Sequence, residues 1–120
     1  MNRPVRCSLI YKKSYNYFQP GHFDKTTANF FLKSFSRNSD IEMSYYPCDN
    51  SFDVKKLKGK CDIILLPSSY PDGSPDKLEN IKSVNIPVIS RTGDPHYAKR
   101  WNQIEFIEKN KIDLFFSSHP

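Results

Sequence analysis

The sequence predicts an α/β protein: a Rossmann-like three-layer sandwich built on a mostly parallel five-stranded sheet. Three observations support this class. Five short apolar runs recur along the 120 residues, and segments with helical spacing or turn formers separate them. The run Asp62–Leu66 is almost entirely apolar and branched, as expected of a strand that is covered on both faces. We therefore expect one domain over residues 1–120, with right-handed crossovers joining its strands.

The five apolar runs predict the strands in chain order. They are Val5–Tyr11, Ile41–Tyr46, Asp62–Leu66, Ile86–Ser90 and Ile112–Phe116.

Four intervening segments predict helices. In Asp24–Arg37, apolar side chains recur at helical spacing. Asp53–Lys58 is a short charged helix that Gly59 ends. In Ser74–Ser83, Ser74 is a cap and a proline occupies the first turn.

The fourth helix runs from Pro95 or His96 to Asn110, with Trp101 on its broad apolar face. Phe106 points more than a right angle away from Trp101 on this helix. Two interpretations stay open: Phe106 faces a partner, or the helix has a wide buried face. Because the chain stops just beyond the last predicted strand, we expect it to be one lobe of a larger protein or a truncated reading frame.

Composition and charge narrow the class of protein. No apolar run approaches the length of a membrane span and no secretory signal is evident, so we expect a cytoplasmic protein. Cys7, Cys48 and Cys61 form no Cys-x-x-Cys pair and are expected to be small buried hydrophobes in a reducing compartment. The net charge of +5 permits contact with phosphates, acidic sugars or an anionic membrane surface. The basic residues are scattered without a nucleic-acid-binding motif, so a solvated basic face is expected and no nucleic-acid partner is predicted.

Four loops follow strand ends and therefore share one edge of a parallel sheet. They hold all three histidines. The loop after the first strand has Gly21 and His22 before a helix, and a helix start favours an anion or a sugar oxygen. In the loop after the third strand, Ser68 and Ser69 could hydrogen-bond a polyol and Tyr70 could stack on a sugar ring. The same three residues are also typical of an ordinary turn, so both interpretations stay open.

The loop from Arg91 to His96 is the strongest candidate. Arg91 supplies a planar cation for phosphate or carboxylate, and Thr92 lies beside it. The spacing of Asp94 and His96 allows one to act as a general base that the other orients, although Asp94 also suits a helix cap. His119 occupies the matching place after the fifth strand.

Several chemistries lack their motifs. The chain has no Gly-x-Gly-x-x-Gly, no P-loop and no Gly-x-Ser-x-Gly elbow. The acidic cluster of a phospho-receiver is missing after the first strand. No metal-ligand cluster is evident, so neither a metal nor a cofactor is predicted.

Two stretches, Pro20-Gly21-His22 and Ile86-Pro-Val-Ile-Ser-Arg-Thr-Gly-Asp-Pro-His96, carry a family resemblance. The chain resembles the N-terminal lobe of a GT-B glycosyltransferase, closest to the spore-maturation-type and retaining family-4-like enzymes. His22 stands where that family has a second glycine, and here the acid precedes the imidazole. The resemblance covers the whole chain at low specificity, with residues 86–100 its best part.

The resemblance implies an acceptor-side lobe of a hexosyltransferase that is inactive as an isolated chain. Its partners would be a nucleotide-sugar donor, held mainly by a second lobe, and a saccharide or other hydroxyl acceptor. Asp94 and His96 would be the acceptor-side polar groups with catalytic roles, and Gly21 and His22 would lie near the donor phosphates.

Two readings without catalysis compete with this one. The first is a flavodoxin-like module for a small ligand or for signalling. The second is a lobe that binds a sugar or a phosphate without turning it over.

Overall fold

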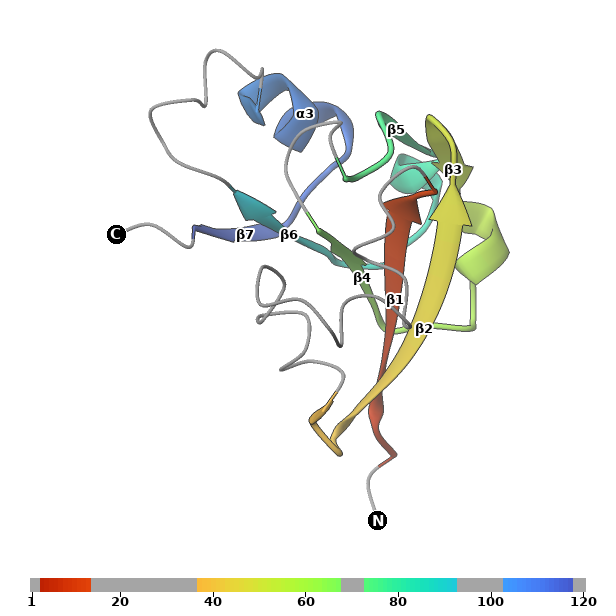
Figure 1. Ribbon diagram of the computed structural model, residues 1–120. Coiled ribbons are helices and arrows are strands. Elements are labelled where there is room, and N and C mark those ends of the chain that lie inside the picture. The colour runs from red at the N-terminus through yellow and green to blue at the C-terminus, as the bar shows by residue number, and fades with distance from the viewer. Residues whose placement is uncertain (1–2, 14–36, 68–72, 93–102, 118–120) are drawn as a thin grey trace.

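The computed structural model describes residues 3–13, 37–67, 73–92 and 103–117, and its centre is a five-stranded sheet (Figure 1). Every neighbouring pair of strands in this sheet is parallel, and the strand order is β2-β1-β4-β6-β7. The strands are β1 (Val5–Lys12), β2 (Ile41–Cys48), β4 (Ile63–Leu66), β6 (Val88–Thr92) and β7 (Leu114–Ser117). The predicted α/β class and five-stranded parallel sheet are confirmed.

The last two strands begin two residues later than the sequence predicts. Pro87 has no N–H to donate to a ladder, and β6 begins directly after it. The Asp113 carboxylate accepts the Val88 N–H at 2.9 Å, and the Asp113 N–H returns a bond to the Val88 carbonyl. Arg91 and Thr92 consequently belong to β6, so the prediction that a loop begins at Arg91 is wrong.

The described connections between β2 and β6 contain no α-helix, only short strands and 3-10 turns. From β2 to β4 the chain forms β3 (Ser51–Asp53) and one 3-10 turn, η2 (Val54–Leu57). This turn replaces the predicted helix Asp53–Lys58. The Asp53 carboxylate caps it by accepting the Lys55 N–H at 3.0 Å, and Gly59 at φ +76° follows it.

The predicted helix Ser74–Ser83 is wrong. The chain instead forms β5 (Lys77–Glu79) and a second 3-10 turn, η3 (Ile81–Ser83). β5 pairs in parallel with β3, and Leu78 is buried between exposed neighbours, which is the period-two pattern of a strand. Asn80 then adopts the left-handed conformation at φ 65°, which an α-helix cannot contain.

The last connection keeps its helix. α3 (Gln103–Lys109) leads from β6 toward β7, and it confirms the predicted helix within the described residues. Of the predicted helix Asp24–Arg37, Arg37 alone is described, and its backbone is helical. None of the helices in these ranges is long and apolar enough to cross a membrane.

Two apolar clusters cover opposite faces of the sheet, because successive side chains of a strand alternate between its faces. The larger cluster joins the sheet to β3, η2, β5, η3 and α3, all on one face (Figure 1). Phe106 of α3 is 3% exposed in this cluster, so it packs inside the chain and does not await a separate partner. Trp101, the other residue of that comparison, lies outside the described residues. The smaller cluster contains Cys7, Leu9, Tyr11 and Leu65.

All three cysteines are buried and free, as the sequence predicts. Burial raises the pKa of the Cys7 thiol to about 12. Cys7, Cys48 and Cys61 therefore pack as small apolar side chains.

The side chain of Asn110 ties α3 to β5. Asn110 is fully buried directly after the helix. Its Oδ1 accepts the Leu78 N–H at 2.7 Å, and its Nδ2 donates to the Asp76 carbonyl at 3.2 Å. The amide thus bonds the edge of β5 as a neighbouring strand would.

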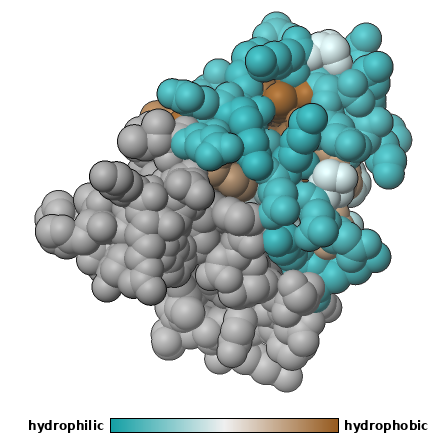
Figure 2. All heavy atoms as spheres, turned by 90° about the horizontal axis from the view of Figure 1, so that it is seen from above, coloured by the Kyte–Doolittle hydropathy of each residue, from teal (hydrophilic) through white to brown (hydrophobic). Residues whose placement is uncertain are grey.

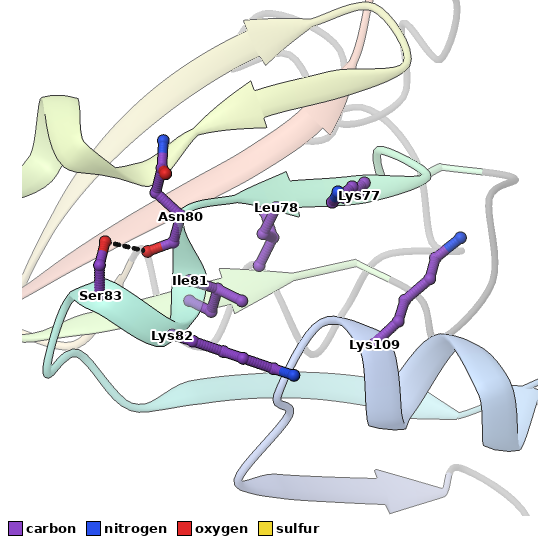
Figure 3. Close-up of a pocket in the computed structure, with 7 residues that line it drawn as sticks. All are labelled: Lys77, Leu78, Asn80, Ile81, Lys82, Ser83 and Lys109. Carbon is purple, nitrogen blue, oxygen red and sulfur yellow. Dashed lines mark hydrogen bonds between the residues drawn. The ribbon is translucent and has the colours of Figure 1, made fainter.

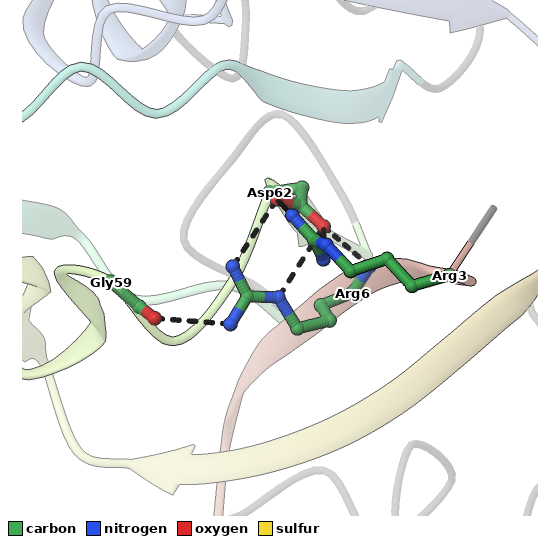
Figure 4. Close-up of polar contacts among 4 residues, drawn as sticks. All are labelled: Arg3, Arg6, Gly59 and Asp62. Atoms are coloured by element: carbon green, nitrogen blue, oxygen red, sulfur yellow. Dashed lines mark hydrogen bonds and ion pairs between the residues drawn. The ribbon is translucent and has the colours of Figure 1, made fainter. Parts of the chain in front are cut away.

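At the amino end of the sheet, Asp62 holds the start of β1 (Figure 4). Its carboxylate accepts two bonds from the Arg3 guanidinium, at 2.9 and 3.0 Å, and the Arg6 backbone N–H at 2.9 Å. The Arg6 side chain also reaches this carboxylate and the Gly59 carbonyl. These contacts lie at the end of the sheet opposite the candidate site.

Candidate functional site

The strand order places the candidate site at the carboxyl ends of the strands. The chain leaves β1 toward β2 on one side, whereas β4 continues to β6 on the other. The direction of winding therefore reverses between β1 and β4. In open parallel sheets, ligands bind at the carboxyl ends beside such a reversal. Figure 2 looks onto the end where β1 and β2 finish, and the described part of it is largely hydrophilic.

Backbone bonds hold the described residues of this edge together. The Lys12 N–H donates to the Gly73 carbonyl at 2.9 Å, which brings the segment after β4 across the end of β1. The Lys13 N–H donates to the Cys48 carbonyl at 2.9 Å and so joins the ends of β1 and β2. These hydrogen bonds fix the positions of β1, β2 and the segment after β4 relative to one another at this edge.

An ion pair reinforces this arrangement. Lys12 Nζ lies 3.2 Å from Asp76 Oδ1, and the Lys12 side chain is 16% exposed. A largely buried cation at the carboxyl end of β1 favours anionic or hydroxyl ligands, and Asp76 offsets part of its charge.

Cys48 is the last residue of β2 and so lies at this edge, but its thiol is unreactive. Its Sγ donates to the Tyr11 carbonyl at 3.4 Å. Burial, and then Asp49, raise the pKa of the thiol to about 11, while Lys12 and Lys13 act weakly in the opposite direction. The thiol is protonated near neutral pH, so Cys48 is no nucleophile.

The structure places two of the predicted site residues. Arg91 and Thr92 end β6, opposite Phe116 and Ser117 of β7. The remaining predicted site residues lie outside the described ranges, although the segments that hold them start at the carboxyl ends of β1, β4, β6 and β7. They are Gly21, His22, Ser68, Ser69, Tyr70, Asp94, His96 and His119.

A hollow of about 540 Å³ adjoins this edge at the ends of β2 and β3. Acidic and basic side chains share its wall, among them Asp49, Glu79, Lys13 and Lys56. Asp53 is committed to internal bonds: the Asn80 amide donates to it at 2.9 Å, and this bond and the Lys55 N–H lower its pKa. Within the ranges that the structure describes, no three His, Cys, Asp or Glu side chains gather as a metal site.

Sequence reasoning missed Lys12 and Asp76 as residues of the edge. Lys12 directly follows the apolar run of the first strand, and this position was the available signal. Asp76 carried none, because its segment was assigned to a helix.

The comparisons with known proteins add no family: no family model, curated protein or solved structure matches the chain.

Proposed function

We propose that the chain is the acceptor-side lobe of a GT-B-type glycosyltransferase, which receives a hydroxyl acceptor at the carboxyl edge of its sheet. The observation that carries the proposal is the all-parallel sheet with its reversal between β1 and β4. The segments that hold Gly21, Ser68 and Asp94 start from adjacent strands of this edge. The resemblance of residues 86–100 supplies the reaction class.

In this proposal Asp94 and His96 face the acceptor hydroxyl. One acts as the general base and the other orients it. Arg91, Thr92, Ser68, Ser69, Tyr70 and His119 bind the polar substrate around them, and Gly21 and His22 lie toward the donor phosphates. The donor nucleotide-sugar is held mainly by a second lobe, and the setting is cytoplasmic.

One observation favours a second candidate, a flavodoxin-like module that binds a small ligand without catalysis. Numbered along the chain, the main strands lie in the order 2-1-3-4-5, which is the order of flavodoxin-like sheets. In those proteins the flavin phosphate binds beside the same reversal.

Binding to the isolated chain separates the two candidates. Saturation-transfer NMR with a panel of mono- and disaccharides is expected to show saccharide contacts. Asp94→Ala and His96→Ala should each weaken saccharide affinity about tenfold, the equivalent of about 1.4 kcal/mol. Asp40→Ala is the control, because Asp40 is exposed and precedes β2 at the opposite end of the sheet.

Sugar transfer is measured with the full-length protein in the presence of nucleotide-sugars. Loss of transfer in Asp94→Ala and His96→Ala is expected, with folding retained. Unchanged turnover in both variants would remove these residues from the mechanism. Saturable binding of flavin mononucleotide without saccharide contacts would instead favour the flavodoxin-like module.

A further inference from the structure

A second hollow, of about 460 Å³, lies between the crossover elements β5, η3 and α3 (Figure 3). Its apolar floor is formed by Leu78 and Ile81, which are 1% and 4% exposed. Three exposed lysines arrive from the three elements: Lys77 from β5, Lys82 from η3 and Lys109 from α3. The hollow has no part in the site proposed above.

The charge around this hollow is one-sided. None of the described residues that line it carries a carboxylate, and within the described chain none of the three lysines has an ion pair. Lys12 shows the contrast, because its ammonium lies against Asp76. Like charges around one hollow repel each other, and a bound anion would relieve that repulsion.

The remaining polar groups of the lining are already used as donors. The Asn80 amide donates to Asp53, and the Ser83 hydroxyl donates to the Asn80 carbonyl at 2.8 Å. The lysines are therefore the donors that a ligand would meet. Ammonium groups are compact point charges with three donors each, which suits the distributed oxygens of a phosphate, whereas planar carboxylates favour arginine.

We propose that this hollow binds a phosphorylated molecule, with a phosphomonoester or diphosphate group among Lys77, Lys82 and Lys109. The apolar part of the ligand packs on Leu78 and Ile81. The volume lies within the range of small-molecule sites, so it holds more than a single phosphate. The same chemistry is offered by a soluble phosphate ester and by a phosphate headgroup in a lipid.

The test begins with inorganic pyrophosphate, titrated into the chain at physiological salt and followed by amide chemical shifts. Saturable shifts are expected at residues 77–83 and 109. The triple variant Lys77→Gln, Lys82→Gln, Lys109→Gln should weaken the affinity at least about tenfold. The control triple Lys58→Gln, Lys60→Gln, Lys111→Gln removes the same charge from exposed positions outside both hollows and should change the affinity less than about threefold.

Vesicles of phosphatidylcholine with a minor fraction of phosphatidic acid form the second arm, read by co-sedimentation. Binding of pyrophosphate alone assigns the hollow to a soluble ligand, and binding of the vesicles alone assigns it to a lipid headgroup. In either case the triple variant Lys77→Gln, Lys82→Gln, Lys109→Gln must lose binding of the probe that the unmodified chain binds. Equal losses in the two triples, or no saturable binding of either probe, would overturn the proposal. If a variant fails to fold, the chemical-shift mapping on the unmodified chain still tests where pyrophosphate binds. Saccharide binding at the sheet edge is a separate measurement, so its failure does not bear on this hollow.

Discussion

At the scale of single residues, the Asp62 carboxylate is the most heavily bonded acid of the described chain. Bonds from Arg3, and then from the Arg6 backbone and side chain, hold its pKa far below the ordinary range of an aspartate. Lone surface ion pairs contribute little to stability, but this one includes a two-bond guanidinium contact and a backbone donor. Asp62 thereby connects the residues before β1 to the start of β4.

The lowered pKa makes a pH dependence testable. Above about pH 4, the ordinary range of an aspartate, Asp62 is ionised in both the folded and the unfolded chain, and its stabilisation is fully present. Below that pH the unfolded chain takes up the proton first, so the stabilisation falls progressively toward the lowered folded pKa. The urea midpoint of Asp62→Asn should therefore lie below that of the unmodified chain at neutral pH, and the gap should shrink as the solution is acidified.

Asp40→Asn is the matched control, because Asp40 is exposed and has no ion pair in the described part of the chain. A gap between Asp62→Asn and the unmodified chain that stays constant from neutral pH to acid would contradict the assignment.

Among single residues, burial was easier to predict than polar contacts. Three cysteines without pairing motifs were correctly expected in the core. Along the chain, Asp62 is 56 to 59 residues from its arginine partners, and Asn110 is 32 to 34 residues from Leu78 and Asp76. Folding alone brings these residues together, so no local sequence pattern announces the contacts. Arg91 was assigned to a loop because its charge follows an apolar run, whereas pairing with β7 extends the strand through it.

At the scale of elements, the crossover from β4 to β6 shows how tertiary pairing overrides a local signal. Ser74 and Pro75 resemble a helix start, and the apolar residues at 78, 81 and 84 recur every three positions. Both signals fit a helix. The Asp76 N–H instead bonds the Asn50 carbonyl at 2.7 Å, and β3 offers a partner for the following residues. A partner that is distant in sequence is invisible to propensity.

The contact between α3 and β5 yields a second prediction. Asn110→Ala removes both side-chain bonds and leaves the buried Leu78 N–H without its acceptor. An unsatisfied buried group costs about 1–3 kcal/mol, so the free energy of unfolding should fall by about 2–3 kcal/mol. Urea titrations measure it as a lower midpoint at an unchanged slope.

Asn85→Ala provides the comparison, because Asn85 is exposed and its side chain makes no hydrogen bond within the described residues. A similar loss of stability in the two variants would show that the Asn110 amide has no special part in joining these elements.

At the scale of the whole molecule, the parallel sheet was predictable because apolar runs alternate with connections long enough to cross it. The strand order was not, since parallel pairing brings together segments far apart in the chain. The order is nevertheless what places the candidate site, because it sets the reversal between β1 and β4. The site itself was predicted as a set of loops, and Lys12 and Asp76 enter it through contacts that only the fold creates.

The sheet predicts an ordered pattern of amide exchange. β1 and β4 each have strand partners on both sides, and Leu9, Ile64 and Leu65 are fully buried. Their amides should exchange most slowly, whereas those of β3 and β5, with three residues each, should exchange earlier. Hydrogen exchange followed by mass spectrometry measures this ranking. Slower exchange in β3 and β5 than in β1 and β4 would show that the small sheet, and not the large one, is the stable centre.

The Asn110 amide has a consequence for how separate molecules meet. Lys77 turns its N–H toward the Asn50 carbonyl beside β3, so Leu78, one residue on, turns its N–H to the opposite side. An open strand border there would be a template on which another chain could add and begin to aggregate. Because a side chain of the same molecule already occupies it, the small sheet is sealed against growth along this border without needing a further strand.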